Sequence, residues 1–183
     1  MIKSLIKFSI VTLLFFNCNS SKLKTYEYDG KVYGEKHVVD DVDAIYKKLT
    51  ETYPNLDRNN PIVILYFFKK DPCNSSGSTN KKILSAFFND LENKIVKIAN
   101  SQPIYIYEKY DRFLEKYRGV LDLKKDPQNF IHNHFFKDKA LYCGGYVLLS
   151  PKGNYISFFS EYSKVSVLKR LRQLPNKRYK ADN

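Results

Sequence analysis

Near the middle of this 183-residue chain lies an unbroken apolar run that leaves few choices for the fold. The run Ile62-Val-Ile-Leu-Tyr-Phe-Phe68 has seven residues and is rich in β-branched and aromatic side chains. It is too short for a buried helix, whereas a strand buried on both faces needs only this length and composition. Asn59-Asn-Pro61 marks a turn before it. We therefore expect Ile62–Phe68 to be the central strand of a sheet with helices on both faces.

Helix and strand patterns alternate after this run. Apolar residues recur at helical spacing over Lys81–Asn100, and a second strand-like segment, Gln102–Tyr107, follows. Two strands joined by a helical crossover should be parallel. Farther along, Pro151-Lys-Gly153-Asn separates Gly145–Ser150 from Tyr155–Phe159, which predicts an antiparallel hairpin. Three more helices are expected, over Lys109–Val120, Pro127–Phe136 and Glu161–Leu174.

The part of the chain before the run carries short elements of its own. Asp29-Gly30 between tyrosine-rich arms predicts a hairpin over Thr25–Gly34. Asp40–Tyr53 has apolar residues at helical spacing, aspartates at its start and Pro54 after its end, which together predict a helix. We treat residues 18–60 as a tether and an N-terminal extension, 61–174 as one domain, and 175–183 as a basic tail.

Residues 1–17 have the organisation of an export signal. Lys3 and Lys7 precede the apolar run Phe8–Phe16, which is too short to span a bilayer and has the length of a signal-peptide core. The segment from Leu14 to Cys18 resembles a bacterial lipoprotein signal, in which cleavage leaves a cysteine that receives acyl chains. This resemblance implies lipidation at Cys18 and a membrane-anchored protein of the cell envelope that faces the periplasm or the exterior. An uncleaved amphipathic anchor and an ordinary secreted protein are the alternatives.

The chain is strongly basic. Its formal net charge is +12, and removing Lys3 and Lys7 with the signal leaves +10. Basic proteins bind anionic membranes, nucleic acids or acidic partners. The one dense basic run lies at the C-terminus and contains Lys169, Arg170, Arg172, Lys177, Arg178 and Lys180. We interpret it as a solvated end able to touch lipid head groups or surface polyanions, and we expect no nucleic-acid partner for an exported protein.

The order strand, helix, strand, helices, hairpin, helix over residues 61–174 resembles the thioredoxin-like superfamily. In that family the first apolar strand runs into a loop with Cys-x-x-Cys at the start of a long helix, and a cis-proline before the hairpin faces the cysteines. Here Cys73 matches the first cysteine, Ser76 stands at the second position, and Gly145 stands at the proline position. The resemblance implies an α/β three-layer fold with a mixed central sheet and, within the motif, a single reactive thiol.

Cys143 is the second candidate for thiol chemistry, because in this fold its segment passes close to the active-site loop. The thiolate is the reactive form, and a helix N-terminus or nearby lysines favour it. If Cys18 carries lipid, Cys73 and Cys143 remain as the two thiols of an exported chain. Either they form a disulfide, structural or redox-active, or Cys143 is a small buried or free residue. A protein thiol or disulfide would be the reaction partner.

Three functions stay open. One is thiol–disulfide exchange through Cys73, and another is a redox-inactive binding or structural module of the envelope, which Ser76 and Gly145 favour. The third is a metal site in which His134 joins the two cysteines. On a helix His132 and His134 diverge by about 200°, which disfavours a shared metal. We see no glycine-rich phosphate loop, paired-carboxylate pattern or serine nucleophile elbow, and we expect no cofactor and no metal.

Overall fold

A seven-stranded mixed sheet forms the middle layer of the protein. The computed structural model describes residues 24–28, 31–39, 41–68, 79–137 and 144–174. The sheet has the strand order β1-β2-β7-β6-β3-β4-β5. Its strands are β1 (Lys24–Tyr28), β2 (Lys31–Val38), β3 (Ile62–Phe67), β4 (Pro103–Tyr107), β5 (Leu123–Lys125), β6 (Gly145–Leu149) and β7 (Asn154–Phe158).

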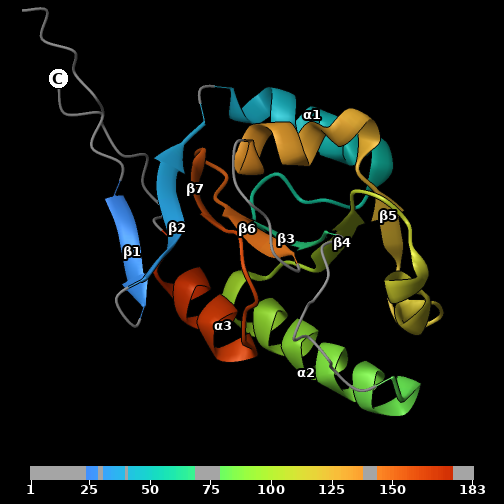
Figure 1. Cartoon of the computed structure of the whole chain (residues 1–183). Helices are drawn as coiled ribbons and strands as arrows, with labels where there is room; N and C mark the ends of the chain where they lie inside the picture. The colour runs from blue at the N-terminus through green and yellow to red at the C-terminus, as the bar shows by residue number, and fades with distance from the viewer. Residues whose placement is uncertain (1–23, 29–30, 40, 69–78, 138–143, 175–183) are drawn as a thin grey trace, which may run out of the picture.

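Helices cover both faces of the sheet. They are α1 (Val42–Thr52), α2 (Lys81–Ala99) and α3 (Lys164–Arg172), with 3-10 turns η1 (Arg112–Tyr117) and η2 (Pro127–Asn129) and a π-type turn η3 (His132–Phe136). Figure 1 shows α1 and the η3 region on one face and α2 with α3 on the other. Within the described residues, none of these helices combines the length and the apolarity that crossing a bilayer requires.

The central strand, β3, serves both cores. All six of its residues are buried. Its side chains alternate in direction, so that Val63, Leu65 and Phe67 join the core under α2 and α3. Ile62, Ile64 and Tyr66 join the core under α1 and η3. The predicted strand at Ile62–Phe68, covered on both faces, is therefore confirmed.

The strand directions match the predicted fold class. β3 and β4 are parallel and are connected by α2, as the crossover argument requires. β6 pairs antiparallel with β3 on one side and with β7 on the other. The Asn80 side chain caps the start of α2 by accepting hydrogen bonds from two backbone amides, and Asn100, in the left-handed region, ends it. The α/β three-layer fold with a mixed sheet, expected from the thioredoxin-like resemblance, is confirmed.

The N-terminal elements extend this sheet. The predicted hairpin is present as β1 and β2, whereas its turn at residues 29–30 lies outside the described residues. β2 then pairs antiparallel with β7, from Gly34 opposite Phe158 to Val38 opposite Asn154. The predicted helix is present as α1, which begins where the Asp41 carboxylate accepts a hydrogen bond from the Ala44 amide at 2.8 Å. Hairpin and helix thus belong to the same folded body as β3.

The prediction of a helix over Lys109–Val120 is wrong. The segment forms only the 3-10 turn η1, in which Leu114 and Tyr117, three residues apart, are both buried. A 3-10 turn aligns residues i and i+3 on one face, and this geometry buries both side chains. The chain then forms β5, a three-residue strand parallel to β4 that the sequence pattern did not predict.

The helix predicted over Pro127–Phe136 is broken. Gln128 and Asn129 have positive φ angles, and the turn that follows, η3, is π-type. The cause lies at Asp126, whose carboxylate accepts hydrogen bonds from the backbone amides of Ile131 and His132, both at 2.9 Å. These bonds draw the start of the turn toward the buried carboxylate and prevent a regular first helical turn from forming at Pro127.

Candidate functional site

The thiol residues predicted from the sequence lie beyond the part of the chain that the structure describes. Cys18, Cys73, Ser76 and Cys143 are all outside it, whereas Gly145 and both neighbouring histidines are described. The described flanks of the two cysteine-bearing segments are Phe68, directly after β3, and Gly144, directly before β6. The geometry of the site is therefore the geometry of this end of the sheet.

Two glycines bring β6 against the end of β3. Gly145 is opposite Tyr66 in the antiparallel ladder. A Cβ atom on Gly144, which has a φ of +129°, would lie 2.5 Å from the Tyr66 carbonyl oxygen. A Cβ atom on Gly145 would overlap the Phe158 carbonyl oxygen and lie 3.2 Å from the Phe136 ring. A side chain at Gly145 would therefore require β6 and β7 to move apart.

A buried carboxylate lies beside the same end of β3. The Tyr66 hydroxyl donates a hydrogen bond to Asp126 at 3.0 Å, and Asp126 is fully buried. Together with the two backbone amides of Ile131 and His132, three donors compensate the lost hydration of this carboxylate. Burial is the main reason why the pKa of the Tyr66 hydroxyl lies well above its ordinary value, and the negative charge of Asp126 raises it further. The hydroxyl is therefore a permanent donor that ties β3 to the start of η3.

The two histidines differ in what they contact. Nδ1 of His134 lies 2.9 Å from the Phe130 carbonyl oxygen, and its ring packs against the Phe130 ring at 4.2 Å between centroids. The His132 ring stacks on Phe68 at 6.0 Å, and its buried Nδ1 has no hydrogen-bond partner. Of the two, His132 rather than His134 keeps a free nitrogen beside the end of β3. Among the described side chains, no three His, Cys, Asp or Glu residues gather as a metal site.

Sequence reasoning missed the Tyr66–Asp126 pair. Tyr66 lies inside the apolar run, where no local pattern separates it from its aromatic neighbours. Asp126 carried a usable signal, because an aspartate directly before Pro127 is typical of a helix start. Its contact with Tyr66 spans 60 residues of sequence, which only the tertiary structure reveals.

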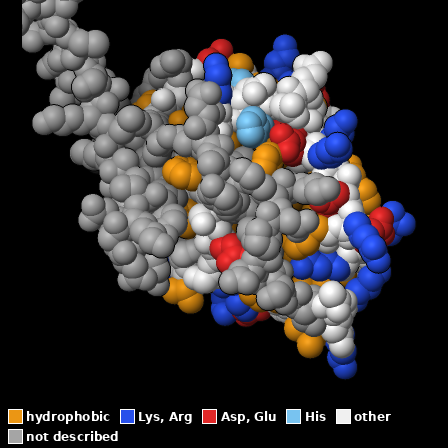
Figure 2. Space-filling view, viewed as in Figure 1, with side chains coloured by type: hydrophobic (Ala, Val, Ile, Leu, Met, Phe, Trp, Pro, Cys, Tyr) orange, Lys and Arg blue, Asp and Glu red, His pale blue; other side chains and the backbone are white. Residues whose placement is uncertain are grey.

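The basic C-terminal run is described only in its first half. Lys169, Arg170 and Arg172 occupy the last turn of α3, where cations favour the negative end of the helix dipole. Lys177, Arg178 and Lys180 lie outside the described residues. On the face shown in Figure 2, Lys and Arg side chains are spread around the described surface and do not merge into one patch.

Comparison with known proteins does not assign this chain to a family. No protein-family model matches the chain, and no curated protein matches it. Among solved structures, the chain is similar to a secreted Mycobacterium tuberculosis disulfide oxidoreductase homologous to E. coli DsbE, at 13% identity and a TM-score of 0.38. The similarity covers 63% of this chain and 83% of that one. We base the fold on the order and direction of the strands alone.

The close packing of Gly145 against Phe158 predicts that a larger residue at this position destabilises the fold. We expect Gly145→Ala to lower the free energy of unfolding by about 1–3 kcal/mol, since the new methyl group must push apart β6 and β7. Urea unfolding at 25 °C measures this loss. An unchanged free energy would mean that the β6–β7 ladder yields without cost.

The buried phenols predict a loss of stability in alkali. Burial raises the pKa of both Tyr66 and Tyr105 above the ordinary value of 10.0, so only the unfolded chain ionises them near that pH. Their contribution to stability is fully present below about pH 10 and is lost as the pH rises above it. Urea unfolding between pH 8 and 11 should show this fall, and Tyr66→Phe should make it shallower by about 1.4 kcal/mol per pH unit. An unchanged slope would mean that Tyr66 ionises in the folded protein.

Proposed function

We propose that this chain is an exported, membrane-anchored thioredoxin-like protein that exchanges thiols and disulfides with protein substrates through Cys73. Cys143 is the proposed second sulfur, because Ser76 occupies the position where the motif would carry its own. The observation that carries the proposal is the close approach of β6 to β3. The segment with Cys143 ends at Gly144, against the Tyr66 carbonyl, and the segment with Cys73 begins three residues after Tyr66.

The proposed reaction is a two-step exchange. The Cys73 thiolate attacks one sulfur of a substrate disulfide, which breaks the substrate S–S bond and releases the other sulfur as a thiolate that takes up a proton. The Cys143 thiolate then attacks the Cys73 sulfur of the mixed disulfide and releases the second substrate thiol. The substrate gains two electrons, and the Cys73–Cys143 pair becomes the disulfide. The reverse sequence would oxidise a substrate dithiol.

A redox-inactive binding module is the second candidate. The specific observation in its favour is Gly145, where the packing against Phe158 and Phe136 excludes the proline that faces the cysteines in the thioredoxin-like pattern. A domain that has lost this proline and the second cysteine of the motif could keep the fold for binding alone. Exchange activity separates the two candidates.

Cys73 and Cys143 have distinct expected phenotypes. We expect Cys73→Ser to abolish disulfide reduction in an insulin assay with dithiothreitol, because the attacking sulfur is gone. Cys143→Ser should still attack but should accumulate the mixed disulfide, detectable by mass spectrometry without reductant. A Cys18→Ser background leaves these two thiols alone and serves as the reference. Activity that survives Cys73→Ser would contradict the proposal, and inactivity of the reference protein would favour the binding module.

The lipid anchor is testable separately. When the full chain is expressed in a bacterium fed an alkyne-labelled fatty acid, we expect label on the protein and its recovery with membranes. Cys18→Ala should remove both the label and the membrane association, because one acceptor thiol is lost. Cys143→Ala is the matched control and should keep both. Label that persists in Cys18→Ala would contradict lipidation at this residue.

A further inference from the structure

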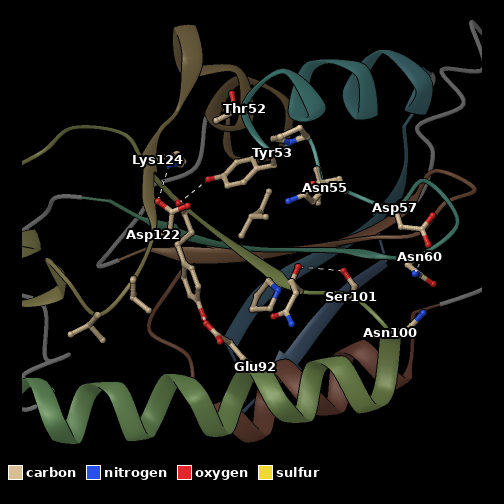
Figure 3. Close-up of a pocket in the computed structure, with 18 residues that line it drawn as sticks. Thr52, Tyr53, Asn55, Asp57, Asn60, Glu92, Asn100, Ser101, Asp122 and Lys124 are labelled. Carbon is tan, nitrogen blue, oxygen red and sulfur yellow. Dashed lines mark hydrogen bonds and ion pairs between the residues drawn. The ribbon is translucent and has the colours of Figure 1, made fainter.

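A pocket of about 590 Å³ opens at the other end of the parallel strands, beside the start of β4. Its walls are the turn after α1, the C-terminal half of α2 with the start of β4, and the segment that leads into β5 (Figure 3). The volume is that of an ordinary small-molecule site. Neither Phe68 nor Gly144, which flank the two cysteine-bearing segments, is among the described residues that line it.

Two tyrosines in the pocket wall donate their hydroxyl protons to hydrogen bonds within the protein. Tyr53 donates to the Tyr105 carbonyl oxygen at 3.0 Å, and the Tyr105 hydroxyl donates to the Glu92 carboxylate at 2.6 Å. Burial raises the pKa of both hydroxyls above the ordinary tyrosine value, so they remain protonated donors. Neither hydroxyl has a proton left to offer a ligand.

Other donors in the wall also have partners within the protein. The Lys124 ammonium pairs with Asp122 at 2.8 Å, and the Asn60 amide donates to the Asp57 carboxylate at 2.8 Å. Figure 3 shows these pairs around the rim of the pocket. Among the described residues that line the pocket, three are carboxylates and one is a lysine, so this part of the lining is negative on a chain whose net charge is +12. The wall therefore offers a ligand mainly acceptors and negative charge.

Glu92 is the half-buried one of these three carboxylates, whereas Asp57 and Asp122 are exposed. Two positions earlier on α2, Asp90 pairs with two lysines, Lys94 and Lys164. In the described part of the chain no lysine or arginine pairs with Glu92, although it is half-buried and its one donor is a neutral phenol. A partly dehydrated carboxylate is best compensated by a cation that also donates hydrogen bonds.

We propose that this pocket binds a small organic cation, a primary amine with a short hydrocarbon stem, whose ammonium group pairs with Glu92. The hydrocarbon stem has an apolar wall to contact, formed by Leu56, Pro103, Ile104, Val120 and Leu121. The Tyr53 ring in the same wall adds a face that attracts cations. The Lys124–Asp122 pair at the rim of the pocket is itself an alkylammonium group paired with a carboxylate, which is the kind of contact proposed for the ligand.

Binding of n-pentylamine to the full chain tests the proposal. We expect chemical-shift changes in amide NMR spectra that saturate and are centred on Glu92 and residues 100–105. Pentan-1-ol has the same stem without the charge and pentanoate has the opposite charge, so both should bind at least tenfold more weakly. Glu92→Gln should weaken the amine at least tenfold, in line with the value of a hydrogen bond to a charged group. Glu161→Gln, an exposed acid outside the pocket, is the matched control and should leave the affinity unchanged.

A second variant separates loss of charge from loss of structure. Tyr105→Phe removes the hydroxyl that donates to Glu92 but keeps the carboxylate, so amine binding should persist or tighten. Absence of saturable shifts with pentylamine, equal binding of pentan-1-ol, or unchanged affinity in Glu92→Gln would each overturn the proposal. Loss of amine binding in Tyr105→Phe, with the spectrum otherwise folded, would also overturn it, because the Tyr105 hydroxyl and not the Glu92 carboxylate would then hold the ligand.

Discussion

The burial of β3 on both faces is the constraint on which the other elements depend. A strand with no solvated side needs helices above and below it and partner strands on both edges. The protein meets the first need with α1 and η3 on one face and α2 and α3 on the other. It meets the second with β4, reached through the α2 crossover, and with β6, which returns antiparallel from the far side. The end of β3 is thereby fixed between Gly145 and Asp126.

Sequence patterns predicted the elements whose burial is regular. α2 repeats its apolar residues at helical spacing, β3 and β4 are short apolar runs, and the β6–β7 hairpin is marked by its Pro-Lys-Gly-Asn turn. β5 has three residues, too few for any period, and η1 and η3 carry helical spacing but are bent by tertiary contacts at Tyr117 and Asp126. Irregular turns of this kind arise from long-range packing, which a local pattern does not contain.

The candidate sites divide in the same way. Cys73 and Cys143 were chosen from residue type and position in the element order, because thiol chemistry depends on a rare residue, and their role stays a prediction. The pocket beside Glu92 could not be predicted, since its walls come from three separate segments and its residues are common types. What distinguishes Glu92 from the other two acids of the pocket is that it is half-buried while no cation pairs with it in the described structure, and that is a property of three-dimensional packing.

The pairing of the N-terminal hairpin with β7 sets how far the domain could stand from a membrane. Since β1 begins at Lys24, six peptide units separate it from Cys18. A fully extended chain spans at most about 3.3–3.6 Å per residue, which gives a tether of roughly 20 Å. With lipid on Cys18 as proposed, the domain would sit against the lipid head groups with little height to spare. Its reachable substrates would then be those at the membrane surface. The length of the tether would thus restrict the choice of substrate independently of any binding site.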